Sequence, residues 1–334
     1  MQLTNKFFPF QLTVIIILFL VSLPMALTAG DNNIGLLQVW QWLNNQQPDP
    51  MASLIITELR LPRLQTAVLT GAALGCAGCL LQRLTRNPLS SPGLLGLNQG
   101  AALGLVALLI SPLPFTPLFS FVAAFIGAGL AMLCVFTVVR IATGALAADS
   151  ILLFGALLST LFGAITSLIL ILDQHALDAI RFWLAGSLSL VNTETLPWLT
   201  IQTLAGISLA FVLCRPLQLL ETGQETARGV GAAPRQILLL VSCVILILTA
   251  SAVAVCGPIL FIGLVVPHLA RFCFSEKIYG HLAGSALLGS LLLILADAGV
   301  QWLDANDRLP PSVALACIGV PWFIWQIRQR YKTQ

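Results

Sequence analysis

Lysine is the first residue type to examine for chemistry, because phosphate-binding loops depend on it. A P-loop has the pattern G-x-x-x-x-G-K-[ST], in which backbone N–H groups and the lysine hold the phosphates of a nucleotide. The three lysines of this chain follow Asn5, Glu276 and Tyr331, so the chain contains no Gly-Lys pair. The sequence therefore excludes a P-loop ATPase.

The residues that usually act as bases, nucleophiles or metal ligands are scattered along the chain. His175, His268 and His281 have no spacing that matches a metal site, and the serine pairs have no histidine or lysine nearby in sequence. We predict that the chain is not an enzyme and has no catalytic residue, no metal ligand and no cofactor. A hydrolase assembled from distant segments is the alternative.

The cysteines point to packing rather than to redox chemistry. Cys76 and Cys79 have the C-x-x-C spacing, but they lie in the middle of an apolar segment. Gly71, Gly75 and Gly78 recur in the same segment at three- and four-residue spacing, which lets two helices approach closely. We predict that the cysteines are small core residues and that this segment is a tightly packed helix.

One ionisable residue lies clearly inside an apolar stretch, namely Asp297 in the run LLLILADAG. A carboxylate near the centre of a membrane helix costs about 2.5 to 3.5 kcal/mol on insertion scales, so it should have a partner or face a cavity. We favour a structural hydrogen bond near the outer end of that helix. The alternative is that Asp297 is the coupling group of a proton- or ion-driven carrier.

The composition identifies the elements that must position these residues. Of 334 residues, 58% are hydrophobic and only 9% are charged, whereas soluble globular chains have about 25% charged residues. These values exclude a soluble enzyme. The net charge of +3, without a lysine or arginine run, gives no support for a nucleic-acid partner.

Apolar stretches long enough to be helices recur along the whole chain. They cover residues 12–29, 64–84, 94–110, 118–139, 151–172, 196–214, 237–256, 259–269, 281–302 and 313–327. Gly257-Pro258 separates a full crossing from a short or re-entrant segment. We predict an all-α polytopic membrane protein with about ten transmembrane helices, forming a single domain over residues 1–334. The first stretch is expected to remain as a helix, with a signal peptide as the alternative.

The positions of the cations predict the orientation of the chain. With ten alternating crossings, only Arg60, Arg63, Arg181 and Arg308 fall on the side opposite the termini, which leaves 12 of the 16 cations on the terminal side. Because cytoplasmic loops are rich in lysine and arginine, both termini should be cytoplasmic. The opposite side carries most of the acidic residues.

The connecting segments contain several distinctive motifs. The outer segment 30–63 is rich in turn residues and ends in RLPR at residues 60–63, where Pro62 and the arginines mark a helix entrance. Asn87 begins an irregular connection that reads NPLSSPGLLGLNQG, through Gly100. On the inner side, residues 215–235 read RPLQLLETGQETARGVGAAPR, with two short helix-like pieces separated by glycines. From composition alone, this loop could equally be a solvated linker.

Together these motifs resemble the FecCD family, the iron-siderophore and cobalamin permease subunits of bacterial ATP-binding-cassette (ABC) importers. The resemblance covers nearly the whole chain. It is carried by residues 60–63 and 87–100, by WLAG at 183–186, by A-x-x-x-G at 227–231 and by GPILFIGLVVPHLAR at 257–271. It implies a ten-helix subunit that dimerises around a central pathway, binds two ATPase subunits inside and receives substrate from a periplasmic binding protein outside.

The resemblance also implies roles for individual residues. Arg60 and Arg63 would pair with glutamates on the binding protein, as exposed arginines on an acidic face also suggest; anchoring the helix end at the headgroups is the alternative. The loop 217–233 would hold a pair of coupling helices seated on the ATPases. Its candidate residues are Glu221, Gly223, Glu225, Ala227, Arg228, Gly229 and Gly231. Asn87 and Leu89, with Ala148 and Asp149, match positions near the cytoplasmic gate, although the last two could be loop filler.

The chain departs from the family pattern at two places. Gln301 stands where many relatives have an arginine, and Pro311-Ser312 replaces the usual glycine after Leu-Pro. A third arginine contact with the binding protein is therefore open, with Arg308 as a candidate replacement that nothing in the sequence supports.

We interpret the chain as an inner-membrane permease that moves a ferric siderophore inward, with ATP hydrolysis in a separate partner chain. Haem and cobalamin are alternatives within the same family, because no residue identifies the ligand. A stand-alone ion-coupled carrier that uses Asp297 is the alternative from a different class. Whether the second permease subunit is the same or a similar chain stays open.

Overall fold

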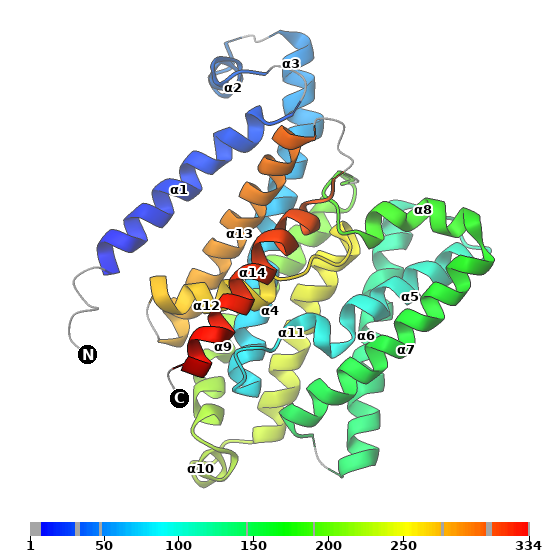
Figure 1. Cartoon of the computed structure of the whole chain (residues 1–334), viewed down its shortest axis with the longest axis vertical. Helices are drawn as coiled ribbons and strands as arrows, with labels where there is room; N and C mark the ends of the chain where they lie inside the picture. The colour runs from blue at the N-terminus through cyan, green and yellow to red at the C-terminus, as the bar shows by residue number, and fades with distance from the viewer. Residues whose placement is uncertain are drawn as a thin grey trace.

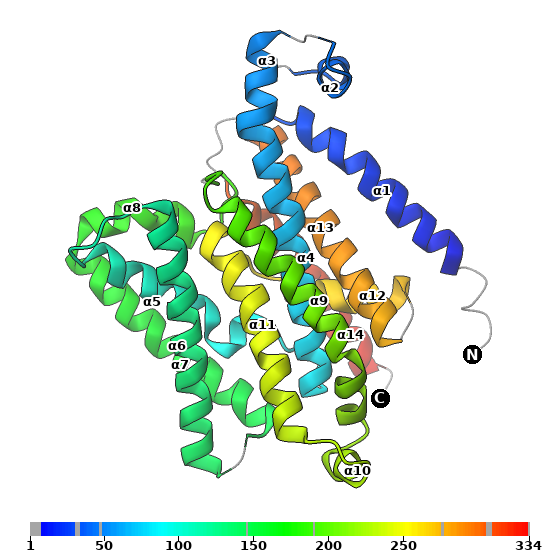
Figure 2. The same ribbon diagram turned by 180° about the vertical axis from the view of Figure 1, so that it is seen from behind.

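The structure is a computed structural model that describes residues 8–30, 34–46, 49–144, 146–189, 191–274, 277–304 and 309–332. Within these ranges every regular element is a helix, as the sequence predicts. Figures 1 and 2 show the helices packed side by side in one elongated bundle.

The predicted membrane segments are all present as helices. Seven helical segments are long and apolar enough to cross a membrane: α1 (Phe8–Thr28), the continuous segment Pro50–Thr85 that includes α4 (Leu61–Thr85), α6 (Pro117–Thr143), α7 (Ala148–Leu172), α9 (Leu196–Glu221), α11 (Pro234–Cys256) and α13 (Ile278–Leu303). Two shorter apolar helices, α5 (Leu97–Leu109) and α12 (Ile262–Cys273), and the apolar segment Pro311–Pro321 of α14 (Pro311–Lys332) complete the set. These helices coincide with the ten apolar stretches of the sequence.

Short helices occupy the connections between the long ones. They are α2 (Leu36–Leu43), α3 (Pro50–Ile55), η1 (Ile56–Arg60), η2 (Pro92–Leu95), α8 (Gln174–Leu184) and α10 (Gln224–Gly229). The segment leading into α4 begins at Pro50, well before the predicted start at Leu64, because Asp49 caps it by accepting the Met51 N–H at 3.2 Å. In Figure 1, α2 and α3 lie at one end of the bundle and α10 at the other. We call these the α2 end and the α10 end.

Helix α4 is the central helix of the bundle, and it packs against α13, α11, α12 and α9 (Figures 1 and 2). Its glycines make these close contacts, since a Cβ atom on Gly71, Gly75 or Gly78 would collide with the backbone of Gly289, Ser285 or Gly263. Cys76 and Cys79 are fully buried in the same helix. The prediction of a tightly packed helix is therefore confirmed.

The break at Gly257 explains the WLAG motif. Gly257 has φ +72°, and a Cβ there would collide with the Trp183 carbonyl group. The indole of Trp183 donates to the Ala254 carbonyl at 3.4 Å, and the Ser187 N–H donates to the Cys256 carbonyl at 2.9 Å. The motif thus ties the end of α8 to the end of α11 and fixes the point where the chain turns into α12.

Candidate functional site

The arginines of the RLPR motif lie at the α2 end, but they are not exposed. Arg63 and Asp297 form a bidentate ion pair, with Nε 2.9 Å from Oδ2 and one terminal nitrogen 2.8 Å from Oδ1. Their side chains are 12% and 5% exposed. Gln301 donates its Nε2 to the same Oδ2 at 2.8 Å. The expectation that Arg63 is an exposed arginine is therefore wrong, because the carboxylate inside the bundle draws it inward.

Arg60 is buried as well. Only 7% of its surface is exposed, and it donates to the Leu27 carbonyl at the end of α1. A small cavity of about 10 Å³, the size of a single water molecule, lies beside Arg60, Arg63, Asp297 and Gln301. Arg60 was also expected to be exposed, and the structure corrects that expectation. Here the guanidinium links α1 to the start of α4.

These contacts support the structural interpretation of Asp297. The carboxylate is held by a guanidinium and a carboxamide near the end of α13, as the favoured structural interpretation predicts. Gln301 donates one neutral hydrogen bond to a carboxylate whose charge is already balanced by Arg63. Arg308, the candidate replacement, lies outside the described residues.

The predicted coupling loop is built differently from the expectation of two short helices. Helix α9 continues through Pro216 to Glu221, so the first predicted piece is the end of a membrane helix. Only the second piece, α10, is a separate helix. Gly223 with φ +122° and Gly231 with φ +83° form the turns on either side of it.

Within this loop the candidate residues divide into buried and exposed groups. Ala227 is fully buried, Gly223 and Glu221 are partly buried, and the exposed ones are Glu225, Arg228, Gly229 and Gly231. Val230 is 69% exposed, and no atom lies within 4 Å of a Cβ built on Gly229. The loop therefore presents an open surface with one apolar side chain at the α10 end.

The gate candidates lie on two separate segments. Asn87 accepts the Leu89 N–H at 2.9 Å in the turn after α4, and Leu89 is 46% exposed. Ala148 and Asp149 form the first turn of α7, where an acidic residue is favourable at a helix N-terminus. The two segments are connected through η2, which packs against α7.

A buried polar network at the α10 end was not predicted from the sequence. Arg83, in the last turn of α4, donates to Glu221 at 2.9 Å and donates its Nε–H to Nδ1 of His281 at 3.0 Å. His281 is fully buried, and its Nε2 lies 2.6 Å from the Pro267 carbonyl oxygen. The only sequence signal was the position of Arg83 and Arg86 three residues apart, which places them on one face of the helix end.

The tautomer of His281 follows from these contacts. The guanidinium of Arg83 can only donate, so Nδ1 of His281 must accept and carries no proton. The proton therefore lies on Nε2, which donates to the Pro267 carbonyl oxygen. Cys79 lies 3.3 Å from Nδ1 and can share it as a thiol donor. The network thus connects α9, α4, α13 and α12 in one continuous chain.

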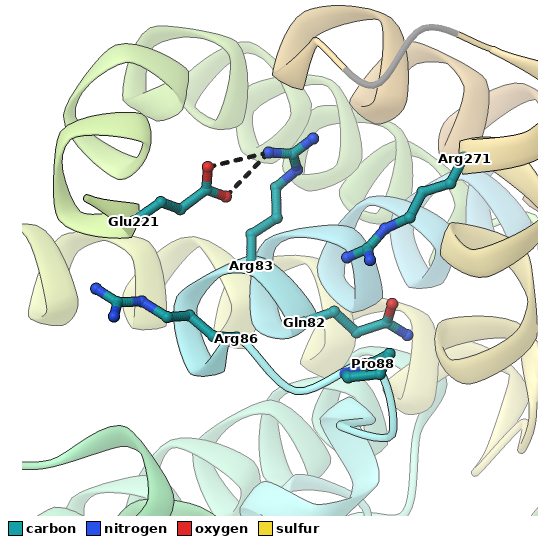
Figure 3. Close-up of a pocket in the computed structure, with 6 residues that line it drawn as sticks. All are labelled: Gln82, Arg83, Arg86, Pro88, Glu221 and Arg271. Atoms are coloured by element: carbon teal, nitrogen blue, oxygen red, sulfur yellow. Dashed lines mark hydrogen bonds and ion pairs between the residues drawn. The ribbon is translucent and has the colours of Figure 1, made fainter. Parts of the chain in front are cut away.

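Beside this network lies a cavity of about 350 Å³. Figure 3 shows the six residues that line it: Gln82, Arg83, Arg86, Pro88, Glu221 and Arg271. The Arg83–Glu221 pair forms one wall, and Arg271 reaches in from α12 (Figure 3). Among the described residues, no group of three or more histidines, cysteines or carboxylates is arranged to hold a metal ion.

The comparisons with known proteins agree with this architecture. The model of the FecCD transport family matches residues 14–329. The chain is 34% identical to the Fe(3+)-citrate import system permease protein YfmD of Bacillus subtilis, over 94% of this chain and 93% of that protein. It is 36% identical to the hemin transport system permease protein HmuU of Yersinia pestis, over 93% and 95% of the two chains.

A solved structure is also similar over its whole length. An ABC transporter described as of the metal-chelate type, in an inward-facing conformation, matches with a TM-score of 0.84. The sequence identity is 28%, and the match covers 96% of this chain and 99% of that one.

Proposed function

The chain belongs to the FecCD transport family, and from this membership we propose that it carries a ferric siderophore inward across the bacterial inner membrane. It acts as the permease subunit of an ABC importer. The observation that carries the proposal is the full-length match to permeases of iron-chelate and haem import, together with the whole-chain match to an ABC transporter of the metal-chelate type.

The energy comes from partner chains. The sequence has no P-loop, and the family consists of transport proteins, so ATP hydrolysis is assigned to two associated ATPase subunits. The exposed surface of the α10 loop supports a contact with them. Glu225 and Arg228 supply charge, and Val230 supplies an apolar side chain that is otherwise unfavourable in water.

The binding protein is proposed to dock at the α2 end. Because Arg60 and Arg63 are buried there, their proposed part in docking is indirect: they hold the ends of α1, α4 and α13 that form the surface beneath the binding protein. Asn87, Leu89, Ala148 and Asp149 are proposed as gate residues at the α10 end. Their support is the irregular backbone between α4 and α5, which is tolerated at membrane depth where it lines a cavity or lies within protein.

Affinity purification of the tagged chain from bacterial membranes tests this proposal. We expect an ATPase with Walker motifs to co-purify, and a second permease chain beside it would identify a heterodimer. Reconstituted with its binding protein, the complex should take up iron-55 siderophore only when ATP is supplied. Uptake by the chain alone without ATP would contradict the proposal.

Haem is the second candidate cargo, because the match to HmuU is as extensive as the match to YfmD. Competition decides between the two. If the proposed cargo is right, iron-55 siderophore should be taken up, and an excess of unlabelled haem should leave that uptake unchanged. If haem is the cargo, labelled haem should be taken up and iron-55 siderophore should not.

A further inference from the structure

The inference begins at the end of α9, where the α10 loop starts. Glu221 is the last residue of α9, and only Thr222 and Gly223 separate it from α10. The carboxylate of Glu221 is bonded to Arg83, while the adjacent Leu220 carbonyl oxygen accepts a hydrogen bond from Arg86. The end of α9 is thus held by two arginines from the end of α4.

The same guanidinium of Arg83 extends into the bundle. Its Nε–H donates to Nδ1 of His281 in α13, and Nε2 of His281 in turn donates to the Pro267 carbonyl oxygen of α12. Arg83 is 11% exposed, whereas Glu221 is 27% exposed. Arg83 is therefore the junction of a hydrogen-bonded path that starts at the loop and ends in the buried core.

The cavity allows this junction to move. About 350 Å³ of space adjoins the Arg83–Glu221 pair, so the Glu221 side chain has room to move while Leu217 and Leu220 of the same helix end stay in the core. Arg86 and Arg271 line the same space, and each is a charged hydrogen-bond donor that can meet the Glu221 carboxylate after a shift (Figure 3). A carboxylate with further charged donors beside it is the kind of group from which a two-state switching element can be built.

We propose that Arg83 is a positioning residue that links the α10 loop to α4, α12 and α13, so that a displacement of the loop is transmitted to the helices of the bundle. This inference rests on the proposed contact between α10 and an ATPase. It adds the route by which binding of the ATPase at α10 would move the membrane helices.

Two variants separate the route from the contact. Glu221→Ala removes the link while leaving the exposed face of α10 unchanged, whereas Glu225→Gln alters the proposed contact on that face and leaves the link intact. In the reconstituted importer we expect Glu221→Ala to bind the ATPase like wild type, while stimulation of ATP hydrolysis by the loaded binding protein falls at least about fivefold. Glu221→Gln, which can still accept a hydrogen bond, should retain part of the stimulation.

Hydrogen–deuterium exchange of the full-length chain supplies a readout that needs no ATPase. Residues 222–233 should exchange faster in Glu221→Ala than in wild type, because the base of the loop has lost its charged anchor. Peptides from α6 should be unaffected. The same result is expected for Arg83→Gln if that variant folds.

The outcomes are distinguishable. Unchanged exchange in residues 222–233, or unchanged stimulation of ATP hydrolysis, would overturn the role of Arg83 and leave the proposed function intact. If no ATPase binds the wild-type chain, the proposed function itself fails.

Discussion

At the scale of single residues, Asp297 shows how one charge inside the bundle determines the positions of others. Its carboxylate accepts bonds from Arg63 and Gln301, and this pairing turns an arginine expected at the surface into a buried one. A polar residue inside a membrane is costly unless paired, so the partner is drawn to the charge. Sequence reasoning identified the cost and the need for a partner, but not which arginine would supply it.

The pairing predicts a loss of stability in Asp297→Asn. The variant leaves the guanidinium of Arg63 without its carboxylate partner. Removing one member of a buried ion pair lowers the free energy of unfolding by about 3–5 kcal/mol. The thermal unfolding midpoint of the purified chain should fall, and uptake should fall in step with the amount of folded protein. The double variant Arg63→Met/Asp297→Leu should regain most of the lost stability. An ion-coupling role would instead give an Asp297→Asn protein of normal stability that cannot transport.

At the scale of elements, the packing of α4 depends on the absence of side chains at a few positions. A Cβ on Gly78 would lie 2.6 Å from both the Cα and the carbonyl carbon of Gly263, so α4 and α12 would have to separate. The spacing of the glycines in the sequence predicted this kind of contact. It could not identify the partner helices, which are distant in sequence.

We therefore expect Gly78→Ala to destabilise the protein by about 1–3 kcal/mol through overpacking. Gly129→Ala in α6 is the matched control, because a Cβ there would meet only Leu246, at 3.9 Å. Since alanine favours a helix by about 1 kcal/mol over glycine, Gly129→Ala should be neutral or slightly stabilising. Equal effects of the two substitutions on thermal unfolding would show that the close contact is unimportant.

The α10 loop gives a prediction about assembly rather than stability. Gly229 has open space around it and an ordinary helical backbone, so Gly229→Leu should leave the permease folded. Its side chain would obstruct a partner on the exposed face, and the affinity for the ATPase should fall at least about tenfold in a co-purification titration. Gly231 is less informative, because its φ of +83° would strain any larger residue. ATPase binding that survives Gly229→Leu would remove the loop from the interface.

The helices of the bundle could be predicted from the sequence because hydrophobic length identifies a membrane segment without knowledge of its neighbours. The functional residues could not be placed in the same way. Glu221 looked like part of a separate loop helix, and only the structure shows it continuing α9 to meet Arg83. Its partner is 138 positions away, and such pairing follows from helix packing rather than from any local pattern.

At the scale of the whole molecule, the two ends of the bundle differ in charge. Arg83, Arg86, Arg228 and Arg271 all lie at the α10 end. The described arginines at the other end are Arg60, which is buried, Arg63, which is largely buried, and Arg181. This asymmetry is the physical basis for placing the α10 end in the cytoplasm. It also agrees with the proposal that α10 contacts ATPases, which need access to cytoplasmic ATP.

Two single cysteine substitutions test this orientation. Asp178 in α8 has a side chain that is 72% exposed, and Glu225 in α10 is exposed at the opposite end (Figure 1). In spheroplasts with an intact inner membrane, a thiol reagent that cannot cross that membrane should label Asp178→Cys at once. Glu225→Cys should be labelled only after the membrane is permeabilised.

The native chain, with Cys243 and Cys317 exposed along α11 and α14, is the background control. The reverse pattern would put α10 outside the cell, where no ATPase could meet it, and would overturn both the orientation and the proposed energy source.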